Sequence, residues 1–458
     1  MTQAIKAADV NSLLNSIIAT TLPVTLLGTT FIPQLLHGGI ILLGRILLRR
    51  VFTDEETAEI RGISRETGIP RFQLVIFNVL LDLLLGCTSG GVLFDGVDND
   101  GDDAERGDAS PQKPSTTYST SRNSPGASSH RFRQTAYRRA RDQATAQSGR
   151  IAHFRTLDWS MDPLRHLTVQ LEYVQSEGGP VIARTVGYFG YVGVLTGVRK
   201  GLSISLNHRA THDGSTWRKE LSFRWHQVMV FLGRRPSISS TLRYFLLPPT
   251  LPDTSVENTN WGKWKKTSRG FRPSPTQSTT PHQPLPEQHD LPATIPIDSI
   301  LTSLATSPST SAYLILCTPQ KVHSLELDNR NLVSVSSSTT FLTTTNHDIA
   351  HESSGSQPPP STPAAIPFME EIIAESMNRK ESAKEAYRQA RRSCRNTRTA
   401  TTPSISLGDI ISILNYNNII DPEVTHYATI MDPTSGRLLW TRAFDPPAEN
   451  VMDQGFEL

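Results

Sequence analysis

The chain has 458 residues, of which 37% are hydrophobic and 19% are charged, and it contains 31 prolines and 29 glycines. Because Ser/Thr/Pro-rich stretches dilute the apolar content, we expect one sizeable folded domain with disordered inserts rather than several full domains. A net charge of +2 excludes a strongly basic nucleic-acid-binding chain, and three cysteines exclude a disulfide-rich scaffold and a four-cysteine zinc site.

The N-terminal segment is the most apolar part of the chain. No Lys, Arg, Asp or Glu occurs between Asp9 and Arg45, but prolines, a glycine pair and several polar residues interrupt the apolar run. The pattern favours two short amphipathic helices and does not fit a cleaved signal peptide. These helices either rest on a membrane, with Arg45, Arg49 and Arg50 at anionic head groups, or pack on the domain as a buried pair. The sequence leaves both interpretations open.

Two further helices are predicted before the first cysteine. Thr53 opens one of them with a capping-box pattern, and this helix is expected to end at Gly68. The apolar run 71–86 predicts a buried helix that ends at Gly86, directly before Cys87.

Three stretches have compositions that cannot bury enough apolar surface to fold alone, and they are residues 96–148, 250–295 and 351–366. The first contains an acidic block and a basic block, which we interpret as a solvated surface rather than an RNA contact. No nucleic-acid partner is therefore expected.

The segments between these inserts carry patterns of strands and helices. Strand patterns occur at 167–174, 178–197, 201–209, 311–317, 321–328, 331–346, 425–432 and 437–444. Helical patterns occur at 215–247, 367–392 and 406–416. Strand-rich blocks between terminal helices predict an α+β layered domain.

Polar residues near predicted strand ends are the candidate reactive groups. Cys87 lies in GCTSGG, where a lone cysteine is most often a buried small side chain. Arg155 and Asp158 in FRTLDW provide a cation that lowers a thiol pKa and a carboxylate that orients an amine, although an ordinary surface ion pair has the same spacing. Asn346 in LTTTNHD either donates to an oxyanion or forms a turn. Spacing alone leaves each of these alternatives open.

The order of several motifs resembles that of the acid ceramidase family, which includes N-acylethanolamine-hydrolysing acid amidase and belongs to the N-terminal-nucleophile (Ntn) hydrolases. The matching segments are EIRGISRETGIP, GCTS, FRTLDW, LTVQLEYV with GYFGYVGVLTG, LSISLNHR, LTTTNHD and THYATIMDPTSG. They span roughly residues 10–90, 151–247 and 311–445. The resemblance implies a four-layer αββα sandwich of the Ntn-hydrolase type.

The resemblance also implies that the chain cleaves itself between Gly86 and Cys87. Residues 1–86 would then form a helical, α-subunit-like segment, and residues 87–458 would form the catalytic, β-subunit-like domain of an αβ heterodimer. The freed α-amine of Cys87 would act as general base for its own thiol, which attacks the carbonyl of a lipid amide.

The family pattern assigns a role to each matching residue. Asp158 would hold the α-amine, Arg155 would support the thiol and the substrate, and Asn346 would donate to the oxyanion. The residues implied to support the site or to bind substrate are Asn207, His208, Arg209 and Arg379. The register that places Arg379, in MNRKESAK, on a family arginine is left open by the sequence.

Two features depart from the family pattern. His208 stands where the family has Glu, so a group that titrates near pH ~6.5 is expected in place of a carboxylate. The insert 96–148 separates Cys87 from Arg155, and the two can meet if the insert leaves and returns at neighbouring strand ends.

We therefore expect a lipid amidase that hydrolyses ceramide to sphingosine and a fatty acid, with a fatty-acid ethanolamide as the alternative substrate. A non-catalytic, membrane-associated lipid-binding relative is the alternative of another class. The expected partners are the lipid amide, an anionic membrane surface and a lipid-presenting helper protein. No cofactor or metal is expected, since His347 and His351 have metal-like spacing without an evident third ligand.

The compartment has two interpretations. The resemblance implies a lysosome-like or vacuole-like setting. The lack of a recognisable signal peptide and of any N-glycosylation sequon points towards the cytosol or a membrane face.

Overall fold

The computed structural model describes residues 44–80, 86–95, 149–159, 161–209, 211–247, 295–329, 331–353, 367–397, 405–417 and 419–445. The apolar segment before residue 44 and, apart from their edges, the three predicted inserts lie outside these residues. No helix within the described ranges is long and apolar enough to cross a membrane.

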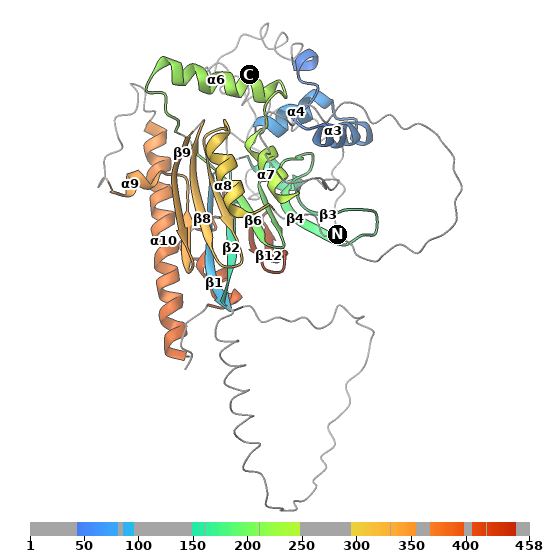
Figure 1. The fold of residues 1–458 in the computed structure, drawn as a ribbon. Coiled ribbons are helices and arrows are strands. Elements are labelled where there is room, and N and C mark those ends of the chain that lie inside the picture. The colour runs from blue at the N-terminus through green and yellow to red at the C-terminus, as the bar shows by residue number, and fades with distance from the viewer. Residues whose placement is uncertain are drawn as a thin grey trace, which may run out of the picture.

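Two antiparallel sheets form the centre of the fold (Figure 1). The five-stranded sheet has the order β10-β1-β2-β11-β12, and the seven-stranded sheet runs from β3 to β9 in sequence order. The strands are β1 (Gly86–Asp95), β2 (Gly149–Asp158), β3 (Thr168–Val174), β4 (Val181–Tyr188), β5 (Thr196–Arg199), β6 (Leu202–His208), β7 (Ala312–Cys317), β8 (Val322–Asp328), β9 (Asn331–Ser338), β10 (Phe341–Thr344), β11 (Thr425–Asp432) and β12 (Arg437–Ala443).

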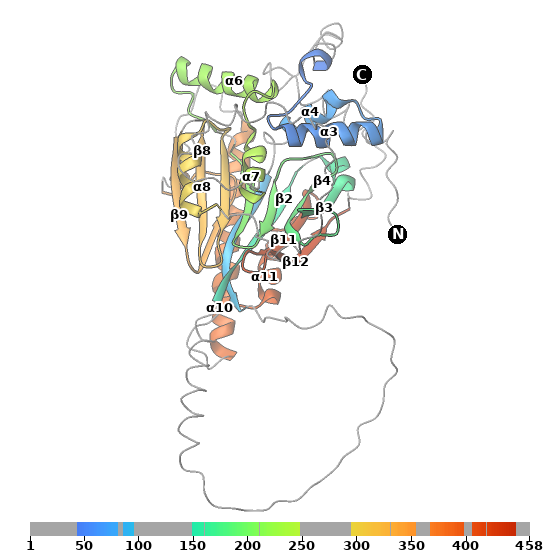
Figure 2. The same ribbon diagram turned by 45° about the vertical axis from the view of Figure 1, so that its right-hand side comes forward.

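Helices lie on the outer faces of both sheets and at one end of them. They are α3 (Asp54–Thr67), α4 (Arg71–Leu80), α6 (Trp217–Phe231), α7 (Ile238–Leu246), α8 (Ile297–Thr306), α9 (Ile349–Ser353), α10 (Pro367–Thr397) and α11 (Leu407–Leu414), with a short 3-10 helix, η2 (Asp162–Leu167). The helices α3, α4 and α6 lie at one end of the sheets (Figure 1). The helices α7 and α8 contact the seven-stranded sheet, while α10 and α11 contact the five-stranded sheet (Figure 2). The predicted four-layer αββα sandwich is therefore confirmed.

The two sheets pack closely because small side chains line the contact. A Cβ atom added to Gly91 of β1 would lie 2.6 Å from the Cβ of Val322 in β8, which is closer than two carbon atoms can approach. Beside this contact, the buried His153 is 2.9 Å from the hydroxyl groups of both Ser203 and Ser205. The TSGG run thus lets β1 lie directly against the other sheet.

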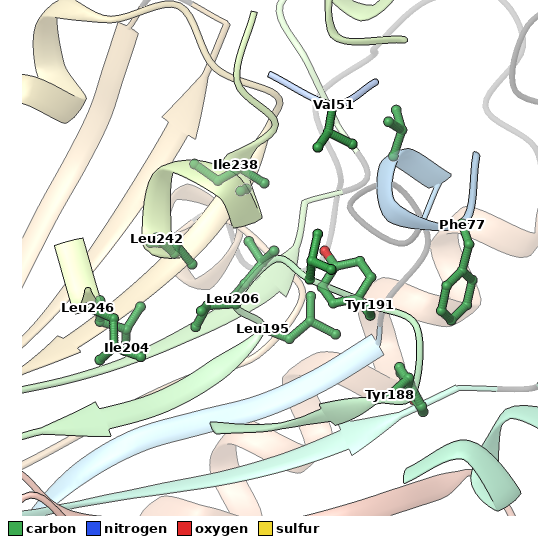
Figure 3. Packing of buried hydrophobic residues seen from close by; sticks show 14 of the residues in the cluster. Val51, Phe77, Tyr188, Tyr191, Leu195, Ile204, Leu206, Ile238, Leu242 and Leu246 are labelled. Carbon is green, nitrogen blue, oxygen red and sulfur yellow. The ribbon is translucent and has the colours of Figure 1, made fainter. Parts of the chain in front are cut away.

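The helices before residue 86 share their hydrophobic core with the strands after it. Figure 3 shows Val51, Phe77 and Tyr191 beside Leu195 and Leu206, all from one cluster of buried residues. Phe77 of α4 meets Tyr191 edge-on, with ring centroids 6.0 Å apart. The described residues 44–80 therefore contribute core to the same packed unit as the strands.

The helix boundaries test the expected capping signals. Thr53 caps α3 by accepting a hydrogen bond from the backbone N–H of Glu56, and Gly68 ends the helix with φ 74°. The predicted N-cap and helix end are confirmed, but the reciprocal bond of a capping box is not the one seen, because the Glu56 carboxylate accepts from the hydroxyl of Thr53. The prediction that the next helix continues to Gly86 is wrong, because Gly86 is the first residue of β1 and pairs with Asp158 of β2.

Two other boundaries differ from the sequence patterns. The stretch 331–346 contains two strands rather than one, and they belong to different sheets: β9 is an edge of the seven-stranded sheet and β10 an edge of the five-stranded sheet. Helix α8 was not predicted, because its IDSILTSLAT sequence follows directly on a Pro-rich linker.

The insert 96–148 leaves and returns at paired residues. In the antiparallel β1–β2 ladder, Asp95 pairs with Gly149 and Ser89 pairs with Arg155. The condition for Cys87 to meet Arg155 is therefore fulfilled, because the insert sits at the end of a hairpin and does not interrupt the ladder.

This register predicts that the insert is dispensable for the fold. Deleting residues 100–146 leaves a short hairpin loop between Asp95 and Gly149, and loop length affects loop-closure entropy only weakly. We expect soluble protein with a melting temperature within a few degrees of the wild type. A Gly/Ser replacement of equal length is the control that separates loop length from loop content. Insoluble protein from the deletion alone would mean that the insert packs on the domain.

Candidate active site

The strand order brings three predicted site residues together at one end of the sheets. Cys87 is near the start of β1, Arg155 lies on the neighbouring β2, and Asn346 follows β10 on the other side of β1. Since β1 lies between β10 and β2, both neighbours reach the same cysteine.

The thiol of Cys87 is fully buried and has a cationic partner. Arg155, itself fully buried, donates from Nη2 to the sulfur at 3.0 Å and from Nη1 to the carbonyl of Leu195 at 2.9 Å. Burial raises the pKa of the Cys87 thiol to about 11, and the charge of Arg155 opposes that shift. In the intact chain the thiol is therefore protonated, and it needs a base to become a nucleophile.

The backbone nitrogen of Cys87 is held by a side chain. Its N–H donates to Oδ1 of Asn346 at 2.7 Å, and Nδ2 of Asn346 donates to the carbonyl of His208 at 2.8 Å. These two bonds fix the orientation of the carboxamide, because one partner can only donate and the other can only accept. Asn346 thus marks the nitrogen that would become an α-amine, while the oxyanion role implied for it stays a prediction.

Asp158 lies at the end of β2 and binds three donors. Its carboxylate accepts from Nη1 of Arg379 at 2.5 Å, from Thr425 at 2.7 Å and from Thr156 at 3.1 Å. Burial raises the pKa of Asp158, and the guanidinium of Arg379 opposes this shift. Arg379 also lies 3.5 Å from Oδ1 of Asn346, so the register that the sequence left open places this arginine in the site.

The residues on either side of His208, at the end of β6, have structural partners. Asn207 donates to the carbonyls of Cys87 at 3.4 Å and Thr344 at 3.2 Å, which ties the two sheets together. Arg209 forms a two-pronged pair with Asp348, at 2.7 Å for each bond. We interpret Asn207 as a support for Cys87 and Arg209 as a support for the loop after β10.

His208 does not behave as a group that titrates near neutrality. Burial lowers the pKa of its imidazole to about 4, and its Nδ1 is a buried atom without a hydrogen-bond partner within the described part of the chain. The expectation of titration near pH 6.5 is therefore wrong, and the side chain is neutral above about pH 4. Its backbone carbonyl, through Asn346, is the part that contacts the site.

The lowered pKa values of the buried histidines predict that acid destabilises the fold. Burial also lowers the pKa of His153 and of His426 to about 3, so between pH 6.5 and 4 the unfolded chain binds protons that the folded chain excludes. Stability must then fall as the pH falls through this window, by up to about 1.4 kcal/mol per pH unit for each such histidine. Melting temperatures measured from pH 7 to pH 4 should decrease. The slope should be shallower for His426→Gln and unchanged for His166→Gln, an exposed control; equal slopes for both would contradict the assignment.

Two polar residues that contact the site were not predicted from the sequence. Thr425 is the first residue of β11 and bonds to Asp158, and it could have been noticed because it opens the THYATIMD motif. Ser376 of α10 accepts from the backbone N–H of Asn346 at 2.6 Å, and no local pattern marks it.

Of the three comparisons with known proteins, only the one with solved structures finds a match. No family model matches the chain, and no curated protein matches it. Among solved structures, 14 chains match, and one of them is a Caenorhabditis elegans N-acylethanolamine-hydrolyzing acid amidase ortholog. That structure is 16% identical in sequence, the match covers 63% of this chain and 90% of that chain, and the TM-score is 0.38. It is one of the two kinds of protein whose motifs the sequence resembles.

Proposed function

We propose that this chain is a lipid amidase that cleaves itself before Cys87 and then hydrolyses the amide bond of ceramide. The observation that carries the proposal is that both the sulfur and the nitrogen of Cys87 are held by site residues, Arg155 and Asn346. The β1–β10 ladder begins only at Ser89 and Thr344, so the Cys87 N–H lies beyond it and is bound by a side chain instead. A cysteine that only fills space requires neither partner.

Self-cleavage follows from the same arrangement. The sulfur of Cys87 attacks the carbonyl carbon of Gly86, the bond to the Cys87 nitrogen breaks, and the thiol proton ends on that nitrogen. Water then hydrolyses the resulting thioester, which leaves a carboxylate on Gly86 and a free thiol and α-amine on Cys87. Arg155 supports the developing thiolate, and Asn346 holds the leaving nitrogen.

Hydrolysis of the lipid amide reuses these groups. The α-amine, with a reference pKa of about 7.7–8.0, takes the thiol proton, and the thiolate attacks the amide carbonyl. The departing sphingosine amine takes up the proton, and water activated by the α-amine releases the fatty acid from the thioester. Asp158, ordered by Arg379 and Thr425, keeps a negative charge near the α-ammonium.

Product analysis tests this proposal and separates the substrates. Purified protein is followed by intact-mass measurement with and without acid incubation, and then assayed with ceramide and with a fatty-acid ethanolamide. We expect two fragments, one that ends at Gly86 and one that begins at Cys87, and faster release of fatty acid from ceramide than from the ethanolamide. Faster release from the ethanolamide would favour the alternative substrate. A chain that stays full length at every pH and releases no product would favour the non-catalytic lipid-binding relative.

An anionic lipid surface is the partner we propose for this activity, because a ceramide scarcely leaves its membrane. Helix α6 exposes apolar side chains on one face, with Trp217 70% exposed, Leu221 59% and Trp225 54%. Tryptophan favours the boundary between lipid and water. The helix lies at the same end of the molecule as α3 and α4 (Figure 1).

The segment 44–50 supplies positive charge next to the C-terminal end of α6. Arg50 donates to the carbonyl of Gly233, just after that helix. Arg45 and Arg49 are exposed, as are the apolar side chains of Ile46 and Leu47. On α6 itself, Lys219 and Arg224 are each paired with an acidic residue, whereas Arg218 is exposed and lies over the ring of Trp217, so Arg218 and segment 44–50 both supply attraction to anionic lipid.

Vesicle co-sedimentation should separate these two contributions. We expect Trp217→Ser/Trp225→Ser, which changes no charge, to lower binding to anionic and neutral vesicles alike, by about tenfold or more. The Arg45→Glu/Arg49→Glu variant should lower binding to anionic vesicles only, and only at low salt, where screening is weak. Val333→Ser, on the exposed edge strand β9, is the control. Wild-type protein that binds neither vesicle, or both equally at every salt concentration, would refute the membrane partner.

A further inference from the structure

One buried residue of α10 holds three consecutive residues after β10. The hydroxyl of Ser376 accepts from the backbone N–H of Asn346 at 2.6 Å and lies 2.9 Å from Nδ1 of His347. The backbone carbonyl of Ser376 accepts from the hydroxyl of Thr345 at 3.0 Å. Ser376 and Thr345 are fully buried, so no solvent competes for these bonds.

One arrangement of protons satisfies the hydroxyl groups of both Thr345 and Ser376. In it, Thr345, whose hydroxyl also lies 3.1 Å from Nδ1 of His347, donates to the carbonyl of Ser376, while Ser376 accepts the N–H of Asn346 and donates to Nδ1 of His347. The ring proton of His347 is then on Nε2, which lies 3.7 Å from a carboxylate oxygen of Glu352, beyond hydrogen-bond distance. His347, Ser376 and Asn346 therefore form one hydrogen-bonded chain, and Glu352 provides a negative charge beside its histidine end.

Helix α10 anchors both ends of this chain. Lys380 and Lys384, one and two turns after Ser376, bind the two carboxylate oxygens of Glu352 at 2.6 and 3.1 Å. The same helix carries Arg379, which reaches Asp158 and the carboxamide of Asn346. The positions of the Asn346 backbone and side chain are thus both set from α10.

We propose that Ser376, oriented by His347 and Glu352, is a positioning residue that fixes Asn346 against the nitrogen of Cys87. Asn346 lies beyond Thr344, the last residue of the β1–β10 ladder, so the ladder does not hold its backbone. The Ser376 hydroxyl accepts the backbone N–H of Asn346 and thereby sets where Oδ1 of Asn346 meets Cys87. This inference rests on the proposed function, in which that nitrogen first leaves and then acts as a base.

The test compares Ser376→Ala with Ser203→Ala. Ser203 is a matched control, because it is also fully buried and also lies 2.9 Å from Nδ1 of a buried histidine, His153. Both variants lose one serine–histidine contact and should lose similar thermal stability. Only Ser376→Ala should slow self-cleavage and lower kcat, by about 10- to 100-fold with KM unchanged, since a displacement near 1 Å costs about that much.

Two substitutions of His347 should reduce activity to different extents. His347→Asn keeps an acceptor for the Ser376 hydroxyl and should retain more activity than His347→Ala, which removes it. Equal kcat in these two variants, or equal kcat in Ser376→Ala and Ser203→Ala, would overturn the inference.

Hydrogen exchange makes the test independent of amidase activity. Ser376→Ala should speed amide exchange in residues 344–348 and leave residues 202–208 unchanged, while Ser203→Ala should not affect 344–348. If the wild type neither cleaves itself nor releases product, the proposed function fails, and this exchange pattern still decides whether Ser376 holds Asn346. Unchanged exchange in 344–348 would show that it does not.

Discussion

Replacing Cys87 by alanine should abolish both self-cleavage and amide hydrolysis, with a loss of at least about 10⁴-fold. The sulfur is the atom that Arg155 binds at 3.0 Å, and alanine offers no nucleophile in its place. Intact-mass measurement should show only the full-length chain at every pH, and product release should fall to the level of the buffer. Residual amidase activity in a homogeneous Cys87→Ala preparation would refute the assignment of the nucleophile.

Cys317 is a matched control for this experiment. Its thiol is also fully buried, and burial also raises its pKa, but it lies in β7 and packs with Ile315 and Val322 between the sheets. Cys317→Ala should lower stability modestly, because it leaves a small cavity, and should preserve both self-cleavage and kcat. A loss of activity in Cys317→Ala equal to that in Cys87→Ala would mean that general core damage explains both.

Replacing Arg379 by alanine should lower kcat/KM by at least about 100-fold. The substitution removes the guanidinium that binds Asp158 at 2.5 Å and leaves that carboxylate buried without its nearest positive charge. The pKa of Asp158 is already raised by burial and must rise further without Arg379, so the carboxylate protonates at higher pH. The acid limb of the pH–rate profile should therefore move to higher pH.

Two further variants define the role of this arginine. Arg379→Lys keeps the charge but not the planar fork that spans Asp158 and Asn346, so it should recover only part of the activity. Arg388→Ala, on the same helix with a side chain 57% exposed, should change neither rate nor pH profile. Wild-type kinetics in Arg379→Ala would remove Arg379 from the site.

Local signals in the sequence predicted much of the layered fold. The N-cap at Thr53 and the terminating Gly68 depend on neighbouring residues only, and both agree with the structure. The alternating strands of both sheets follow from the same kind of local pattern. The division of 331–346 between two sheets could not be predicted, because it depends on which distant strand each half meets.

The residues of the candidate site also divide into those that local motifs predict and those that only tertiary packing determines. Cys87, Arg155 and Asn346 were identified from motifs, and the strand order brings them together. Ser376 was not identified, because only the packing of α10 on β10 determines which residues of the helix face Asn346. The lowered pKa of His208 also required the structure, since desolvation depends on atoms that lie far away in sequence.

The paired ends of the insert also determine when during folding the reactive groups can meet. The β11–β12 hairpin closes through a tight turn between Asp432 and Arg437, whereas β1 and β2 must close a loop that spans residues 96–148. Each doubling of loop length adds only about 0.6 kcal/mol, but over this range the added entropic cost reaches about 2 kcal/mol and slows the closing of the β1–β2 pair. The Cys87 sulfur and the Arg155 guanidinium come together only when that pair forms. Under the proposed mechanism, a newly made chain cannot cut itself until its central sheet has closed, so slow pairing of β1 with β2 delays assembly of the nucleophile.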